Sequence, residues 1–409
     1  MGKKIVHITF SDKVGGAAVA AYRLHKLMLN NGIDSRMVVF EKLRKDERIS
    51  TVFNSGLDIY IKKIKIYFWG VKSFSLNNKY GHYSTFSLGG NIRNNKIINE
   101  AEVIYLHWVN SGLINFKDIE YLLKKNKKVI WIMHDMFPIT GGCHHSFDCE
   151  GYKGKCNCCH FFDNSNKPIY QLNQKSKLKN YNNMYWVAPS KWLFDKASSS
   201  IAVEKKRLYY IPNAISDNFF HLDKSFSKEA LGLESQYNYI LYGANNLLNN
   251  PYKGYEFLPQ VIDSIISNVD EIELRNIKLL LFGLTENESL KNIIKIPIVF
   301  MGDILDECAM NLLYNASSIL LMTSVAENAP LVIQECKACG TPIVAFDVGG
   351  IPEMINNKNE GVVLKKGDVA EMASAVIDIL RYNIADNVSI MNLDTNKFVI
   401  SEHINLINE

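Results

Sequence analysis

Short runs of apolar, β-branched residues alternate with amphipathic helical patterns along almost the whole chain. In the first half, strands are predicted at residues 4–10, 35–40, 103–107, 129–134 and 184–189, with a helix at 17–30. The pattern starts again after residues 211–214, with strands at 239–243, 278–283, 298–301, 319–323, 342–346 and 361–364 and helices at 255–266 and 368–383. Strands that alternate with helices are typical of parallel sheets joined by crossover helices. We therefore predict an α/β protein of two doubly wound, Rossmann-like units.

The chain of 409 residues is long enough for two such units, each with its own core. We expect a first domain at residues 1–215, with a cysteine-rich insertion at 135–160, and a second at 216–391. The tail at 392–409 is expected to pack back on the first domain. Because ligands of such folds bind beyond the carboxyl ends of the strands, the expected site is a cleft between the two facing domains.

Composition and charge exclude several classes of protein. The chain is 47% apolar and 22% charged, with a formal net charge of +4, which is far too weakly basic for a dedicated nucleic-acid binder. The first ten residues are too polar for a signal peptide, and no apolar run approaches the roughly 20 residues that span a bilayer. We therefore expect a cytoplasmic protein whose cysteines are reduced or bound to metal.

The segment at residues 323–340 carries the most informative chemistry. Glu327 is expected in a loop, Pro330 in the first turn of a helix, Glu335 inside that helix and Gly340 at its end. Free amides at a helix start accept phosphates, and eight helical residues would separate the two carboxylates by about 12 Å. That spacing suits a ribose and a sugar of one nucleotide sugar. The alternative is two ordinary glutamates on a helix surface.

Glu327 and Glu335 resemble the paired glutamates of retaining glycosyltransferase family 4, whose members have the GT-B fold. The similarity extends through residues 338–353 and keeps its order along nearly the entire chain. Further matching segments lie at residues 15–17, 187–192, 211–214, 253–254, 302–303 and 312–316. The run at 133–144 resembles a bacterial surface-polysaccharide branch of this family, which carries cysteines at this place.

The resemblance implies a role for each site residue. Glu335 would bind the ribose, Glu327 the donor sugar, and Lys253 the diphosphate as charge develops on the leaving group. His107 would contact the donor sugar, although a histidine at a strand end is more often structural. Family members carry an arginine shortly before the lysine, and its absence here leaves Asn245 as an uncharged substitute. The remaining implied donor contacts are Gly15, Gly16, Asn328, Ala329, Pro330, Leu331 and Gly302.

These features predict an enzyme that moves a sugar from a UDP- or GDP-sugar to a glycan acceptor. The resemblance implies retention of anomeric configuration and an undecaprenyl-pyrophosphate-linked acceptor in capsule, O-antigen or exopolysaccharide synthesis. The chain contains no Asp-x-Asp, so no catalytic divalent metal is expected. The alternatives are a nucleotide-sugar epimerase, a phosphorylase, or a catalytically silent module that binds a nucleotide or a glycan.

Five cysteines fall within residues 140–160. Cys156 and Cys159 have the spacing of a chelating turn, and Cys143 with Cys149 would complete four thiolates around a structural zinc ion. The alternative is a set of reduced thiols without metal.

Residues 59–99 contain basic and aromatic residues but no acidic one. Ile61, Ile64, Tyr67, Phe68 and Val71 can share one helix face, with lysines around it. Such a helix could rest on the anionic inner face of the plasma membrane, which suits a lipid-linked acceptor. The alternative is a helix packed in the core of the first domain.

Overall fold

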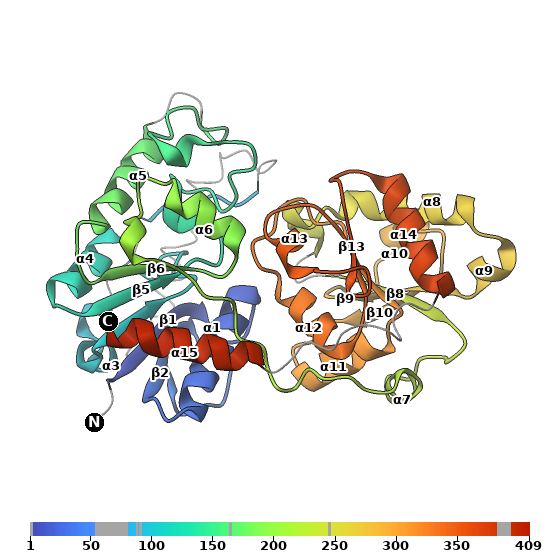
Figure 1. Cartoon of the computed structure of the whole chain (residues 1–409), viewed down its shortest axis with the longest axis horizontal. Coiled ribbons are helices and arrows are strands. Elements are labelled where there is room, and N and C mark those ends of the chain that lie inside the picture. The colour runs from blue at the N-terminus through green and yellow to red at the C-terminus, as the bar shows by residue number, and fades with distance from the viewer. Residues whose placement is uncertain are drawn as a thin grey trace. The chain divides into compact units, whose positions relative to one another are not determined.

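The computed structural model describes residues 3–53, 81–86, 89, 92–162, 166–243, 247–382 and 394–409. The chain divides into two compact units (Figure 1): Met1–Ala214 with Thr395–Glu409, and Ile215–Asp394. Each unit is described by itself.

The first unit is built on a seven-stranded sheet with the order β3-β2-β1-β4-β5-β6-β7, in which paired strands run parallel. Its strands are β1 (Ile5–Ser11), β2 (Ser35–Glu41), β3 (Ile49–Thr51), β4 (Val103–Leu106), β5 (Lys128–Ile132), β6 (Met184–Ala188) and β7 (Leu208–Tyr210). Its α-helices are α1 (Gly16–Asn30), α3 (Lys96–Glu100), α4 (Phe116–Lys124), α5 (Lys167–Leu178), α6 (Lys191–Ser198) and α15 (Asp394–Asn408).

The C-terminal helix α15 belongs to the first unit, where Figure 1 shows it in red beside α1 and β1. Its buried residues Val399, Ile400, Leu406 and Ile407 share one apolar cluster with residues of β1, β4 and β5. The last helix therefore covers one face of the sheet that the first strand begins.

The second unit contains a six-stranded sheet with the order β10-β9-β8-β11-β12-β13, again with parallel pairs. Its strands are β8 (Asn238–Gly243), β9 (Ile277–Phe282), β10 (Ile298–Gly302), β11 (Ile319–Met322), β12 (Ile343–Phe346) and β13 (Gly361–Leu364). Its α-helices are α7 (Lys224–Ala230), α8 (Leu258–Asn268), α9 (Glu271–Arg275), α10 (Glu288–Ile293), α11 (Glu307–Ala316), α12 (Leu331–Cys339), α13 (Ile351–Met354) and α14 (Val369–Tyr382).

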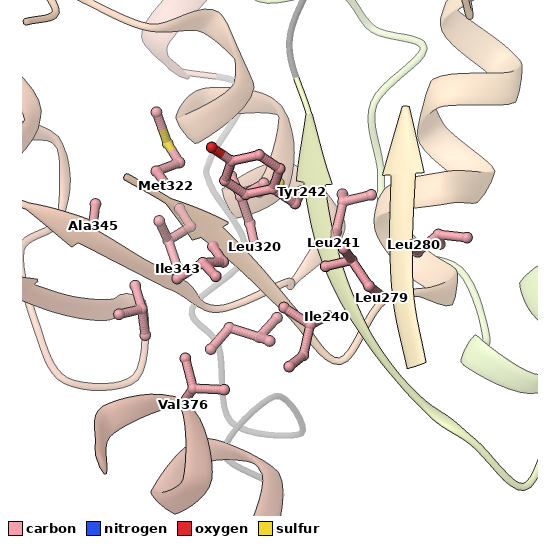
Figure 2. Packing of buried hydrophobic residues seen from close by; sticks show 14 of the residues in the cluster. Ile240, Leu241, Tyr242, Leu279, Leu280, Leu320, Met322, Ile343, Ala345 and Val376 are labelled. Carbon is pink, nitrogen blue, oxygen red and sulfur yellow. The ribbon is translucent and has the colours of Figure 1, made fainter. Parts of the chain in front are cut away.

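The core of the second unit explains why these short strands are almost uninterrupted apolar runs. Figure 2 shows side chains of β8, β9, β11 and β12 packed together, with Val376 of α14 reaching the same cluster. Strands of a parallel sheet that is covered on both faces bury every side chain, so they lack the alternation of half-exposed strands. Leu279, Leu280 and Leu281 in β9 are all fully buried.

Both sheets have the strand order of a Rossmann fold, confirming the predicted fold class. When the strands of each sheet are numbered from 1 in chain order, both sheets contain the order 3-2-1-4-5-6. The direction of winding therefore reverses between β1 and β4 in the first sheet and between β8 and β11 in the second. Ligands of such sheets bind beyond the carboxyl ends of the strands at this reversal point. The residues that follow β8 and β11 are therefore the first place to look for a site in the second unit.

Candidate functional site

The loop after β11 lies at the reversal point of the second sheet and carries Glu327. Glu327 accepts a hydrogen bond from the Lys253 ammonium, with 2.6 Å between Lys Nζ and Glu Oε1, and the Ser324 hydroxyl lies 2.9 Å from the same oxygen. The Lys253 and Glu327 side chains are 26% and 12% exposed, so the pair is reachable by a ligand but largely shielded from water. The structure thus brings together two of the three predicted catalytic residues.

Two glycines pack so closely against the backbone of this loop that no residue with a Cβ would fit in their place. Gly254 has a φ of +58°, and a Cβ there would lie 2.1 Å from the Thr323 carbonyl oxygen. Gly349 has a φ of +60°, and a Cβ there would lie 1.6 Å from the carbonyl oxygen of Glu327. The close approach of Gly349 therefore fixes the backbone on which the Glu327 carboxylate is mounted.

The Thr323 hydroxyl ties the lysine turn to the sheet. It donates to the carbonyl oxygen of Gly254 at 2.8 Å, and the Tyr242 hydroxyl lies 2.8 Å from it. Lys253 itself ends a short 3₁₀ turn, Pro251–Lys253, and its carbonyl oxygen lies 3.2 Å from the Thr323 hydroxyl. Sequence reasoning missed Thr323 and Tyr242, because nothing in their spacing connects them to Lys253.

Replacing Gly349 with alanine is expected to destabilise the second unit by about 3 kcal/mol, because the new Cβ must displace the backbone of Glu327. Gly367→Ala is the matched control: its φ is +85°, but its Cβ would meet nothing closer than 4.0 Å. That variant carries the backbone strain alone, about 1 kcal/mol. Hydrogen exchange of β11 and β12 amides measures the loss of stability in both variants. Equal losses would contradict the role of the close approach between Gly349 and Glu327.

Glu335 is the fifth residue of α12 and is 6% exposed. The Tyr314 hydroxyl donates a hydrogen bond to its Oε2 at 2.6 Å. Burial raises the pKa of Tyr314 well above 10, and the neighbouring Glu335 carboxylate raises it further, so the phenol remains a donor. Tyr314 therefore orients the carboxylate that the resemblance assigns to the ribose.

The start of α12 differs slightly from the prediction, whereas its end agrees with it. The helix begins at Leu331 and Pro330 is its N-cap residue rather than part of its first turn, whereas Gly340 ends it in the left-handed conformation as predicted, with a φ of +78°. The N-cap side chain supplies no hydrogen bond to the first turn. Asn328 is 4% exposed and lies with Ala329 in the loop that leads to this end of the helix.

Two of the remaining predicted donor contacts, Gly302 and Gly15, have the left-handed backbone that favours glycine. Gly302 ends β10 with a φ of +65°, and Gly15 precedes α1 with a φ of +91°; neither they nor Gly16 would meet an atom within 4 Å of an added Cβ. Asn245 lies outside the described residues.

In the first unit, His107 lies in a hydrogen-bonded file of three histidines. His7 Nδ1 is 2.9 Å from His107 Nε2, and His107 Nδ1 is 2.9 Å from His134 Nε2. A small pocket is lined by His107, His134 and His403 with Asn213 and apolar neighbours. Burial lowers the pKa of His7 and His107 well below 6.5, and that of His134 to about 4, so all three rings are neutral at pH 7.

Asp135, the residue after His134, forms a hydrogen bond with His144 that sequence reasoning did not foresee. His144 Nδ1 lies 2.6 Å from Asp135 Oδ2, and Ser84 Oγ lies 2.8 Å from His144 Nε2. Burial works to raise the pKa of Asp135, but His144 and the backbone amide of Phe137 outweigh it and lower the pKa. The pair fixes the loop that leads from β5 into the cysteine segment.

The cysteine segment gathers its thiols without forming a coordination site. A Cβ added to Gly151 would lie 3.4 Å from both Cys149 Sγ and Cys156 Sγ, so the two sulfurs are neighbours. Burial raises the pKa of Cys143 to about 12 and that of Cys156 to about 11. Among the described residues, no group of three or more histidine, cysteine or acidic side chains is arranged to hold a metal ion.

The predicted membrane-facing helix at residues 61–72 lies outside the described residues. Among the helices that the structure does describe, none has both the length and the apolar character needed to cross a membrane.

Comparison with known proteins places these features in a family context. Residues 239–382 match the model of the family Glycosyl transferases group 1. N-acetyl-alpha-D-glucosaminyl L-malate synthase of Bacillus anthracis is 26% identical over 172 residues, which is 40% of this chain and 41% of that protein. The chain therefore matches about two-fifths of the length of this curated relative.

Two solved structures share the fold over nearly their whole length. WaaG, a glycosyltransferase involved in lipopolysaccharide biosynthesis, has a TM-score of 0.65 at 11% identity, covering 98% of this chain and 99% of that one. Alr3699/HepE of Anabaena in complex with UDP has a TM-score of 0.61 at 15% identity, with the same coverage. The chain thus has the GT-B fold, and residues 239–382 of its second unit match the Glycosyl transferases group 1 model.

Proposed function

We propose that the protein transfers a sugar from a nucleotide diphosphate sugar to a glycan acceptor. The observation that carries this proposal is the arrangement of Glu327, Lys253 and Glu335 around the reversal point of the second sheet, inside the Glycosyl transferases group 1 domain. The UDP bound to the Anabaena structure supports a uridine diphosphate as the donor nucleotide.

Each residue has a separate task in this mechanism. Glu335, held by Tyr314, accepts hydrogen bonds from the ribose hydroxyls. Glu327 accepts from the sugar hydroxyls, while the Lys253 ammonium moves from its carboxylate to the diphosphate. As the glycosidic bond breaks, negative charge grows on the diphosphate, and a fixed cation in a partly water-excluded site stabilises that charge strongly. The amides of Ala329 and of Leu331, at the start of α12, add partial positive charge.

The reaction proposed here retains the anomeric configuration. The Bacillus anthracis relative is named for an N-acetyl-α-D-glucosaminyl product, and an α-linked product from an α-linked donor is retention. We further propose an acceptor on a lipid pyrophosphate at the inner face of the plasma membrane, in bacterial surface-polysaccharide synthesis. The role of WaaG in lipopolysaccharide biosynthesis supports this choice.

The test is a transfer assay with UDP-glucose, UDP-N-acetylglucosamine and GDP-mannose against a panel of octyl glycosides, with the product linkage determined by NMR. We expect one donor to give an α-linked product. A β-linked product would contradict retention, and conversion of the donor to an epimer without acceptor would contradict transfer.

We also propose that Cys143, Cys149, Cys156 and Cys159 close around one structural zinc ion. The proximity of Cys149 Sγ and Cys156 Sγ supports this, as does the hydrogen bond that the Gly151 amide donates to Cys149 Sγ at 3.4 Å. Because no three ligands are yet in place, zinc would have to draw the thiols together. Protein purified without chelator or nickel is expected to contain about one zinc per chain. Less than about 0.2 per chain would favour reduced thiols without metal.

A further inference from the structure

The three-histidine file, made of His7, His107 and His134, crosses three neighbouring strands. His7 lies within β1, His107 directly follows β4, and His134 comes two residues after β5. These strands are adjacent in the sheet, which explains why residues so far apart in sequence meet. The exposure of the rings increases along the file: His7 is fully buried, His107 is 3% exposed, and His134 is partly exposed.

Two hydrogen bonds between three neutral rings leave few proton arrangements. A neutral imidazole carries one N–H and one acceptor nitrogen, and both nitrogens of His107 are used within the file. If His7 donates to His107, then His107 must donate to His134, whose proton then sits on Nδ1. If the direction is reversed, His7 carries its proton on Nε2, and His134 Nδ1 is bare. No third arrangement keeps both bonds.

The surroundings of His7 favour one of the two proton arrangements. Its Nε2 is buried without a hydrogen-bond partner, so one arrangement leaves an orphaned N–H there and the other an orphaned lone pair. Tyr105 stacks on the ring with centroids 4.8 Å apart, and His25 approaches edge-on at 5.9 Å. Buried N–H groups without a partner are rarer than unsatisfied acceptors, so the lone pair is the less costly orphan.

We propose that His7 is a positioning residue that sets the tautomer of the whole file, so that His134 carries its proton on Nδ1 and presents it away from the file. His107 then has no nitrogen left for the sugar contact that the family resemblance implied. The consequence for catalysis rests on the proposed glycosyl transfer. The tautomer itself does not, and it can be measured without any substrate.

The decisive experiment is long-range proton–nitrogen correlation NMR on protein labelled with ¹⁵N-histidine at pH 7. Peaks lost in His7→Asn, His107→Asn and His134→Asn identify the three rings. We expect all three to be protonated on Nδ1 with a bare Nε2. Protonation of His107 or His134 on Nε2 in the wild-type protein would overturn the proposal.

A pair of His7 variants then separates positioning from packing. The amide of His7→Asn can place a donor near the former Nδ1, so the Nδ1–H form of His107 and His134 should persist. His7→Leu lacks a donor, and the two rings should shift towards Nε2–H, with kcat/KM lower on the order of 10-fold. Unchanged tautomers in a folded His7→Leu variant would overturn the role of His7. If the wild-type protein transfers no sugar, the glycosyltransferase proposal fails while the NMR result still stands.

Discussion

Replacing Lys253 with alanine is expected to lower kcat by about 100- to 1,000-fold with a smaller change in KM, because the charge that Lys253 stabilises develops in the transition state. Its ammonium is the cation paired with Glu327 at 2.6 Å, in a site where both side chains are largely shielded from water. A charge in such a place stabilises the transition state more than a charge on an open surface does, because water screens its electrostatic interactions less.

Lys278→Ala is the matched control for this variant. Lys278 also forms an ion pair in the second unit, with Glu234 at 2.8 Å, but it lies near the start of β9, two strands away from β11 in the sheet. We expect its loss to change kcat by less than about twofold, because ion pairs with an exposed partner contribute little. Steady-state kinetics of both variants tests this expectation. A decrease in kcat of less than threefold for Lys253→Ala would show that Lys253 has no role in the mechanism.

Acidification from pH 7 to pH 5 is expected to destabilise the first unit strongly. Burial lowers the pKa of His25 to about 4, that of His134 to about 4 and that of His403 to about 3. Below pH 6.5 the unfolded chain therefore takes up protons that the folded chain refuses, so the free energy of unfolding falls as the pH falls. Each such ring contributes a loss of about 2 kcal/mol by pH 5.

Urea unfolding followed by tryptophan fluorescence measures this effect in the first unit, because the second unit, Ile215–Asp394, contains no tryptophan. His25→Asn offers a matched variant: His25 Nδ1 bonds the Ser35 hydroxyl at 2.8 Å, and the asparagine amide can replace that bond without titrating. Its loss of stability between pH 7 and pH 5 should be smaller by about 2 kcal/mol. An identical loss in variant and wild type would mean that His25 is not held neutral.

The predicted strands agree with the structure to within one or two residues, because the strands of a covered parallel sheet are continuous apolar runs. The predicted strand at 319–323 is β11, Ile319–Met322, and the one at 361–364 is β13. β3 and β7 were missed, since each is three residues long. Such short edge strands carry too few residues for a recognisable pattern.

Local patterns predict the candidate site only where its parts are close in sequence, whereas Lys253 was assigned through the family resemblance. Glu327 and Glu335 belong to one loop-and-helix segment, so their placement before and within α12 followed from Pro330 and Gly340. Lys253 is 74 residues from Glu327, and their ion pair depends on the adjacency of β8 and β11 in the sheet. Strand order is a tertiary property that no local pattern encodes.

The histidine file illustrates the same limit. His7 is a buried histidine between the apolar residues Val6 and Ile8 of β1, and sequence reasoning passed over this signal. Its partner could not be named without knowing that β4 lies beside β1. His107 was therefore singled out as a sugar contact, whereas the structure engages both of its ring nitrogens within the file.

The central claim is that the second unit binds a nucleotide sugar through Glu335 and its neighbours. Saturation-transfer NMR with UDP-, GDP- and ADP-glucose on wild-type protein and on Glu335→Gln tests it directly, since the substitution keeps the shape of the side chain and removes its charge. The account predicts that one nucleotide sugar gives a saturation-transfer signal from its ribose and that the variant loses it. Equal signals from both proteins, or none from the wild type at millimolar donor, would contradict the claim.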